Sequence, residues 1–129
     1  MNKHKAIIVC ILIAYVLVVL GEILLLRKPF VGEHLQLEPF WSYKVIGVQY
    51  KQMLGNVIMF IPIGFLLSII DKRVWLVLLI SLSFSCLIEI LQLLLETGLC
   101  ELDDAFHNTM GALIGLLISK CIIKKYRNS

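Results

Sequence analysis

Three polar side chains recur on one face of a stretch that is otherwise almost wholly apolar. Ser85, Glu89 and Gln92 are spaced i, i+4 and i+7, so a helix would place a hydroxyl, a carboxyl and an amide in one column. Such a column can bind the polar head of a ligand, and a partly desolvated carboxyl can act in general acid–base catalysis. The same groups can instead bond to neighbouring helices as structural contacts.

A second polar group opens the next apolar stretch. Asp104, Asn108, Gly111 and Gly115 are spaced i, i+4, i+7 and i+11, which sets two polar groups above a smooth glycine surface that a neighbouring backbone can approach closely. Asp104 also suits the N-cap of a helix, a purely structural role. Weak candidates for ligands of a divalent metal are Asp103, Asp104 and His107, although a lone histidine here also fits an interfacial polar residue.

Other familiar chemical motifs are missing from the sequence. It has no Cys-x-x-Cys, no recognisable Ser-His-Asp arrangement and no glycine-rich phosphate loop, so no cofactor is predicted. The four cysteines are spread far apart, which argues against a disulfide scaffold. The formal charge of +3 is small and scattered, and it does not suggest a nucleic-acid-binding protein.

Composition points to a membrane protein. The chain has 129 residues, of which 60% are hydrophobic and 16% are charged. A small soluble domain must keep a large surface wet and is about 45–50% apolar. Lipid is therefore the expected solvent, and residues 1–129 are expected to form one membrane domain.

Hydropathy predicts an all-α bundle of four transmembrane helices with a longer first outer loop. Each predicted span is long enough, or nearly so, to cross a hydrocarbon core of about 30 Å. Pro62 and Gly64 in the second span predict a kink. The spans are predicted at residues 6–26, 54–70, 74–95 and 105–123.

Because successive spans alternate in direction, the polar residues within them fall in one leaflet. We expect a polar pocket between the third and fourth spans, open outward and roofed by the first outer loop. The predicted pocket residues are Asn56, Glu89, Gln92, Asp104 and Asn108.

The positive-inside rule predicts the orientation of the chain. With the N-terminus inside, the cytoplasmic flanks collect eight lysines and arginines and the outer flanks collect four. Both termini are therefore predicted to be cytoplasmic.

Three ordered blocks of this sequence resemble the core of the VanZ-like family. They begin at Asn56, Ser85 and Asp104, and a Pro39-Phe40 element in the first outer loop is also similar. The resemblance implies a bacterial integral membrane protein, whose named member is associated with resistance to the glycopeptide teicoplanin. The positions that match the structural pattern of the family are Pro39, Phe40, Pro62, Gly64, Gly111 and Gly115.

Three functions follow as hypotheses. In the first, the outer-leaflet pocket binds a lipid-linked or lipoglycopeptide ligand and contributes to glycopeptide resistance or envelope function. In the second, the protein is a membrane-embedded acid–base or metal-assisted enzyme acting on a lipid-linked substrate. In the third, it is an interaction module that assembles with itself or a partner. The lipid bilayer is a predicted partner in all three, nucleic acid in none, and the sequence does not predict the oligomeric state.

Overall fold

Four long helices dominate the computed structural model, which describes all residues except 1–2, 27–31, 33–34, 45 and 128–129. They are α1 (Lys3–Gly21), α3 (Ile46–Ile70), α4 (Val74–Leu94) and α5 (Leu102–Arg127). Each is long and apolar enough to cross a membrane. In lipid a helix satisfies its backbone hydrogen bonds internally, which is why long apolar runs adopt this structure. The prediction of an all-α membrane protein with four spans is confirmed.

Several short elements lie between the long helices. A π-helix, η1 (Glu22–Leu26), follows α1, and a single turn, α2 (Trp41–Lys44), precedes α3. Strand β1 (Leu35–Gln36) pairs in parallel with β2 (Cys100–Glu101), so the loop before α3 is hydrogen-bonded to the connection between α4 and α5. Hydrophobic periodicity does not reveal two-residue strands, and the sequence analysis did not predict them.

Helices α3 and α5 make the most extensive contact in the bundle, and glycines make it possible. A Cβ atom built on Gly64 would lie 1.9 Å from the carbonyl oxygen of Ala112. One on Gly111 would lie 2.1 Å from the oxygen of Val57, and one on Gly115 would lie 2.0 Å from that of Ile61. The glycine surface predicted on the fourth span therefore faces the second span.

The remaining helices pack around this pair. The apolar core includes Phe60 and Ile63 from α3, Ile88 from α4 and Leu116 from α5. Helix α1 is the most exposed, with only 6% of its span buried, although the hydroxyl of Tyr15 donates to the carbonyl oxygen of Met59 at 3.0 Å. Exposed apolar side chains on α1 are what contact with lipid requires.

Helix boundaries extend beyond two of the predicted spans. Helix α3 begins at Ile46, before the predicted start at residue 54, and it continues through Pro62. Helix α5 runs from Leu102 to Arg127, past both ends of the predicted 105–123. The added turns carry polar residues, which hydropathy alone assigns to loops.

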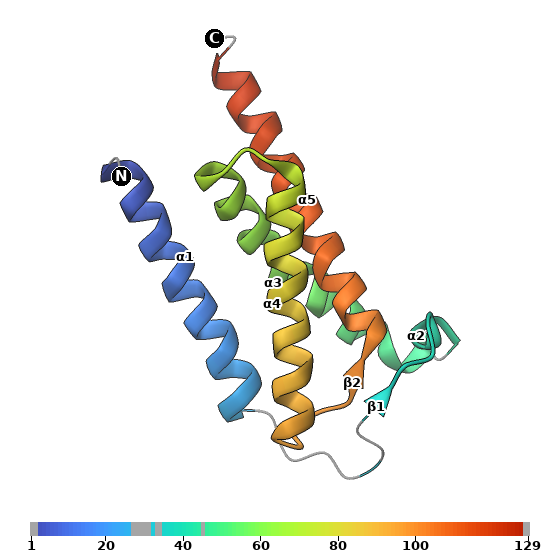
Figure 1. Ribbon diagram of the computed structural model, residues 1–129. Coiled ribbons are helices and arrows are strands. Elements are labelled where there is room, and N and C mark those ends of the chain that lie inside the picture. Colours follow the sequence, from blue (N-terminus) through green and yellow to red (C-terminus); the bar gives the residue numbers. More distant parts are fainter. Residues whose placement is uncertain (1–2, 27–31, 33–34, 45, 128–129) are drawn as a thin grey trace.

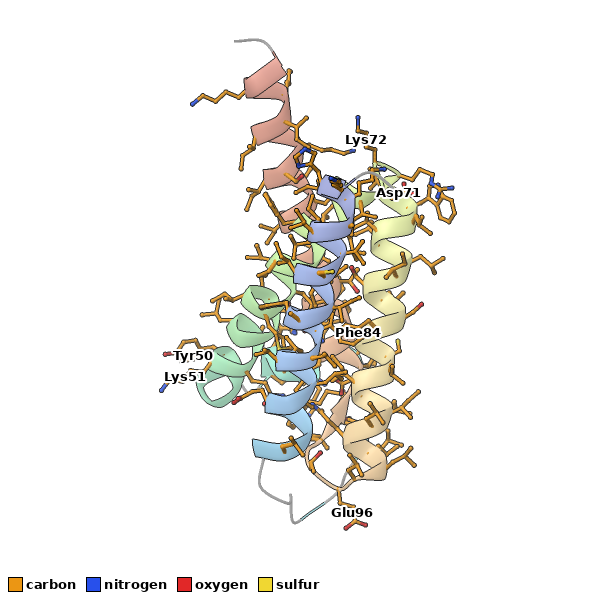
Figure 2. The ribbon with its side chains drawn as sticks, turned by 90° about the vertical axis from the view of Figure 1, so that its left-hand side faces the viewer. Tyr50, Lys51, Asp71, Lys72, Phe84 and Glu96 are labelled. Carbon is orange, nitrogen blue, oxygen red and sulfur yellow. The ribbon has the colours of Figure 1, made fainter. Side chains whose placement is uncertain are left out.

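Both termini lie at one end of the bundle (Figure 1). Seen from the side, Asp71 and Lys72 lie at this same end, and Glu96 lies at the other (Figure 2). Strands β1 and β2 and helix α2 also lie toward the end that is distant from the termini (Figure 1).

Candidate functional site

A group of polar side chains is buried at the end of the bundle opposite the chain termini, and we call it the polar end. Each member is no more than 6% exposed. It contains every predicted pocket residue and two residues that the sequence analysis did not include among its candidates, Ser42 and Glu101. The full set is Ser42, Asn56, Glu89, Gln92, Glu101, Asp103, Asp104, His107 and Asn108.

Asp103 binds the turn that contains the Pro39-Phe40 element. Its Oδ1 accepts the backbone N–H of Phe40 at 2.7 Å, and its Oδ2 accepts both the N–H and the hydroxyl of Ser42 at 2.9 and 2.6 Å. Phe40 has a φ of 60°, a left-handed conformation that is uncommon for a bulky residue. The three bonds from Asp103 hold the chain in this conformation at the start of α2.

The aromatic residues of this loop contact α5 directly. The hydroxyl of Tyr43 lies 3.0 Å from Nε2 of His107, and the ring of Phe40 packs edge-on against that of Phe106 at 6.3 Å between centroids. These contacts fasten the first loop to the N-terminal part of α5.

Gln52 joins two of the buried carboxylates. Its Nε2 donates to Oδ2 of Asp104 at 3.0 Å and lies 3.4 Å from Oε1 of Glu101. The sequence analysis missed Gln52 because it precedes the apolar run of the second span. The structure also buries Glu101, which is 3% exposed. The only feature of the sequence that points to Gln52 is its position, about one helical turn before Asn56.

Glu89 links α4 to the strand pair. Its Oε2 accepts the backbone N–H of Glu101 in β2 at 3.0 Å. Ser85, one turn earlier on the same helix, accepts a hydrogen bond from Nδ2 of Asn108 at 2.8 Å. The polar face predicted on the third span therefore points into the bundle and contacts α5 and β2.

Some buried polar atoms of this end have no hydrogen-bond partner within the described part of the chain. They include Nδ2 of Asn56, Oε1 of Gln92, Nδ1 of His107 and Oδ1 of Asn108. An unsatisfied buried polar group costs about 1–3 kcal/mol. A further polar group bonded to any of these atoms would recover that cost.

Two hollows are lined by residues of α4 and α5 and of the loops beside them. The larger has a volume of about 390 Å³, and the smaller has a volume of about 240 Å³. Leu102 and Ala105 line both, and their walls are mainly apolar. Asp103 contributes to the larger hollow, and Glu89 and Glu101 contribute to the smaller. The other polar-end residues line neither of these hollows.

The weak metal candidates do not form a ligand set. Asp103 and His107 are bonded to the first loop as described above, while Asp104 contacts Gln52. Across the residues that the structure describes, no three His, Cys, Asp or Glu side chains are grouped so that they could hold a metal ion. The geometry gives no support to the metal-assisted form of the enzyme hypothesis.

The electrostatic character of the polar end is visible at Cys100, which lies between α4 and α5. Burial raises the pKa of this thiol, and the nearby carboxylates of Glu89, Asp104 and Glu101 raise it further. Where these carboxyl groups are ionised, they favour cations and hydrogen-bond donors over anions.

Comparisons with known proteins agree with the resemblance noted in the sequence. Protein VanZ of Enterococcus faecium is 36% identical over 73 residues, which cover 52% of this chain and 43% of that relative. The aligned region thus spans less than half of the relative's length. No solved structure matches the chain. The family model described as VanZ/LLP1 matches residues 6–124, and the chain therefore belongs to the VanZ/LLP1 family.

Proposed function

We propose that the polar end lies in the outer leaflet of a bacterial cell membrane and binds a lipid-linked or lipoglycopeptide ligand. Binding contributes to resistance to the glycopeptide teicoplanin or to envelope function. The observation that carries the proposal is that two mainly apolar hollows are lined in part by the buried acidic residues Asp103, Glu89 and Glu101. An amphiphile has the same two parts, a lipid chain and a polar head.

The two parts of the ligand would occupy different regions. An acyl chain fits the larger hollow, which includes Leu82 of α4 and Phe106 of α5. The polar head would meet Glu89 in the smaller hollow and, farther inside, the unsatisfied oxygens of Gln92 and Asn108. Displacing lipid from the apolar walls gains little energy, so specificity would come from the polar contacts.

The negative charge of the carboxylates at the polar end limits the class of ligand that can bind there. Carboxylates and amide oxygens accept hydrogen bonds, and they repel a phosphate. Sugars and peptides present hydroxyl, amide and amine donors. This favours a lipoglycopeptide, or a lipid-linked molecule recognised through its glycan or peptide, over recognition of a diphosphate group.

The test is drug susceptibility in a sensitive Gram-positive host that expresses the chain. Glu89→Gln keeps an oxygen that can accept the N–H of Glu101, and Asp104→Asn keeps one that can accept from Gln52, so we expect both variants to fold while losing charge. We expect each to lower the teicoplanin inhibitory concentration toward that of the empty host, at equal abundance in the membrane. Glu96→Gln removes an exposed carboxylate from the same connection and should have no effect.

Binding is measured directly with a photoactivatable lipoglycopeptide on purified protein. We expect crosslinks on α4 and α5 near the hollows, reduced in Glu89→Gln and unchanged in Glu96→Gln. A glycopeptide without an acyl chain should compete weakly. If both polar-end variants keep full resistance and full crosslinking, the polar end is not the binding site.

A further inference from the structure

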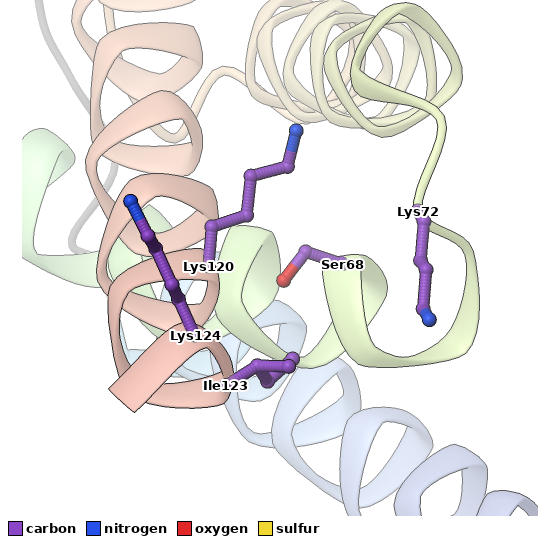
Figure 3. A pocket seen from close by; sticks show the side chains of 5 residues that line it. All are labelled: Ser68, Lys72, Lys120, Ile123 and Lys124. Atoms are coloured by element: carbon purple, nitrogen blue, oxygen red, sulfur yellow. The ribbon is translucent and has the colours of Figure 1, made fainter. Parts of the chain in front are cut away.

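A different pocket, of about 320 Å³, lies at the opposite end of the bundle, near the chain termini (Figure 3). Two elements bring cations to it. Lys120 and Lys124 lie four residues apart on α5, and Lys72 lies in the short connection between α3 and α4. The remaining lining residues are Ser68 of α3 and Ile123 of α5. We call this the basic pocket.

No salt bridge within the described residues involves a lysine of the basic pocket. Asp71 is the side-chain carboxylate nearest in sequence to Lys72, but it pairs with Arg73, whose Nη2 lies 2.7 Å from Oδ2 of Asp71. Hydrogen bonds from Arg73 lower the pKa of Asp71 to about 2, so this acid stays ionised and bonded to Arg73. Among the described residues, the other side-chain carboxylates belong to the opposite half of the bundle or to its loops.

The remaining walls complete an amphiphilic site. Ser68 is only 4% exposed, and its hydroxyl, which donates to the carbonyl oxygen of Phe65 at 2.8 Å, lies beside Lys120 in Figure 3. Ile123 adds an apolar wall, and the three lysines lie near the ends of the apolar runs, where phospholipid headgroups are found. Lysines at helix ends extend toward this region and attract anionic lipids.

From these observations we propose that the basic pocket binds the phosphate headgroup of an anionic phospholipid such as phosphatidylglycerol. Lys72, Lys120 and Lys124 neutralise the phosphate, and Ile123 contacts the upper part of an acyl chain. This site is separate from the polar end, where the charge has the opposite sign. Diffuse attraction of a basic tail to the membrane needs no defined pocket. The site proposed here needs lysines from two elements, α5 and the connection between α3 and α4, around the same pocket.

The experiment uses the full chain in nanodiscs that contain phosphatidylcholine and phosphatidylglycerol, with native mass spectrometry to count the lipids retained. We expect the wild type to retain phosphatidylglycerol in preference to phosphatidylcholine. Each lysine near an anionic surface contributes a factor of about 5 in affinity, so the double variant Lys120→Gln/Lys124→Gln should bind about 30-fold more weakly. Lys72→Gln should lose about 5-fold, although it lies on another element.

The matched control is Lys3→Gln/Lys5→Gln, which removes two exposed cations from the same end of the bundle but outside the pocket. It should retain the lipid preference. Lys120→Arg/Lys124→Arg alters the same two positions but keeps their charge. It should bind the lipid as the wild type does, which separates a loss of charge from a loss of folding in the glutamine variant. Equal losses in the control and the pocket variants, or no preference for the anionic lipid, would overturn the proposal. Inorganic phosphate that displaces the lipid at low millimolar concentration would show that the pocket takes a free anion instead.

Discussion

Single residues of the polar end make structural contacts that the sequence does not reveal. Asp103 is a candidate ligand by composition, yet both of its carboxylate oxygens are occupied by the backbone and hydroxyl of the first loop. Gln52 shows the converse, since an unremarkable polar residue joins two buried acids. In both cases the partner lies about 50 to 60 residues away in the chain, and no local spacing rule relates such positions.

The reactivity of Cys100 provides a prediction at the same scale. Burial and the carboxylates of Glu89, Asp104 and Glu101 raise its pKa, so little thiolate is present near neutral pH. Removing a negative charge by Glu89→Gln should lower that pKa and speed alkylation at a fixed pH below it, by about tenfold for each unit of change. The variant should still react more slowly than an exposed thiol, because burial is the larger cause.

The measurement is the rate of maleimide labelling of purified protein as a function of pH, in a background where Cys10, Cys86 and Cys121 are replaced by alanine. Glu96→Gln is the control, because that carboxylate is not among the groups that raise the pKa of Cys100. An unchanged profile in Glu89→Gln would show that its charge does not act on the thiol.

At the scale of elements, the sequence predicts the long helices well and the short ones poorly. The apolar runs place all four spans, since length and hydropathy are properties of each segment alone. Strands β1 and β2 contain two residues each, and α2 contains four, so they exist through tertiary contacts such as the bonds from Asp103. The pairing of α5 with α3 through glycines was also unpredicted, because the Gly111–Gly115 spacing indicates close packing without naming the partner.

The close contact between α3 and α5 predicts that a larger residue at Gly111 destabilises the protein. A methyl group on Gly111 would lie 2.1 Å from the carbonyl oxygen of Val57, so Gly111→Ala must push the helices apart. We expect a loss of about 1–3 kcal/mol in the free energy of unfolding, the usual range for overpacking. Titration of the detergent-solubilised protein with SDS, followed by tryptophan fluorescence, measures this loss.

Gly55→Ala is the matched control on α3, because a Cβ at Gly55 has no atom within 4 Å. That substitution should be neutral or should stabilise the helix by up to about 1 kcal/mol, since alanine favours helix more than glycine does. Equal stabilities of the two variants would mean that the close approach of α3 and α5 does not limit stability.

The whole molecule is polarised along the bundle axis. Buried acids and amides occupy one end, while the termini, the Asp71–Arg73 connection and the basic pocket occupy the other (Figures 1 and 2). Lysine and arginine are retained on the cytoplasmic side during insertion, whereas acidic residues have little influence on the orientation of the chain. The same charges that form the basic pocket are therefore expected to orient the protein, with the polar end outside.

This orientation is tested with two reporters. Green fluorescent protein fused to the C-terminus should fluoresce, and alkaline phosphatase fused after Gly98, beyond the third span, should be active, because each works on only one side of the membrane. Replacing Lys120, Lys124 and Lys125 with glutamine removes three of the eight lysines and arginines counted on the cytoplasmic side, against four on the other, and should give mixed orientations. Lys44→Gln/Lys51→Gln removes cations from the outer side and should strengthen the original orientation. A dark C-terminal fusion together with an inactive phosphatase fusion would place the polar end in the cytoplasmic leaflet, where an extracellular glycopeptide could not reach it.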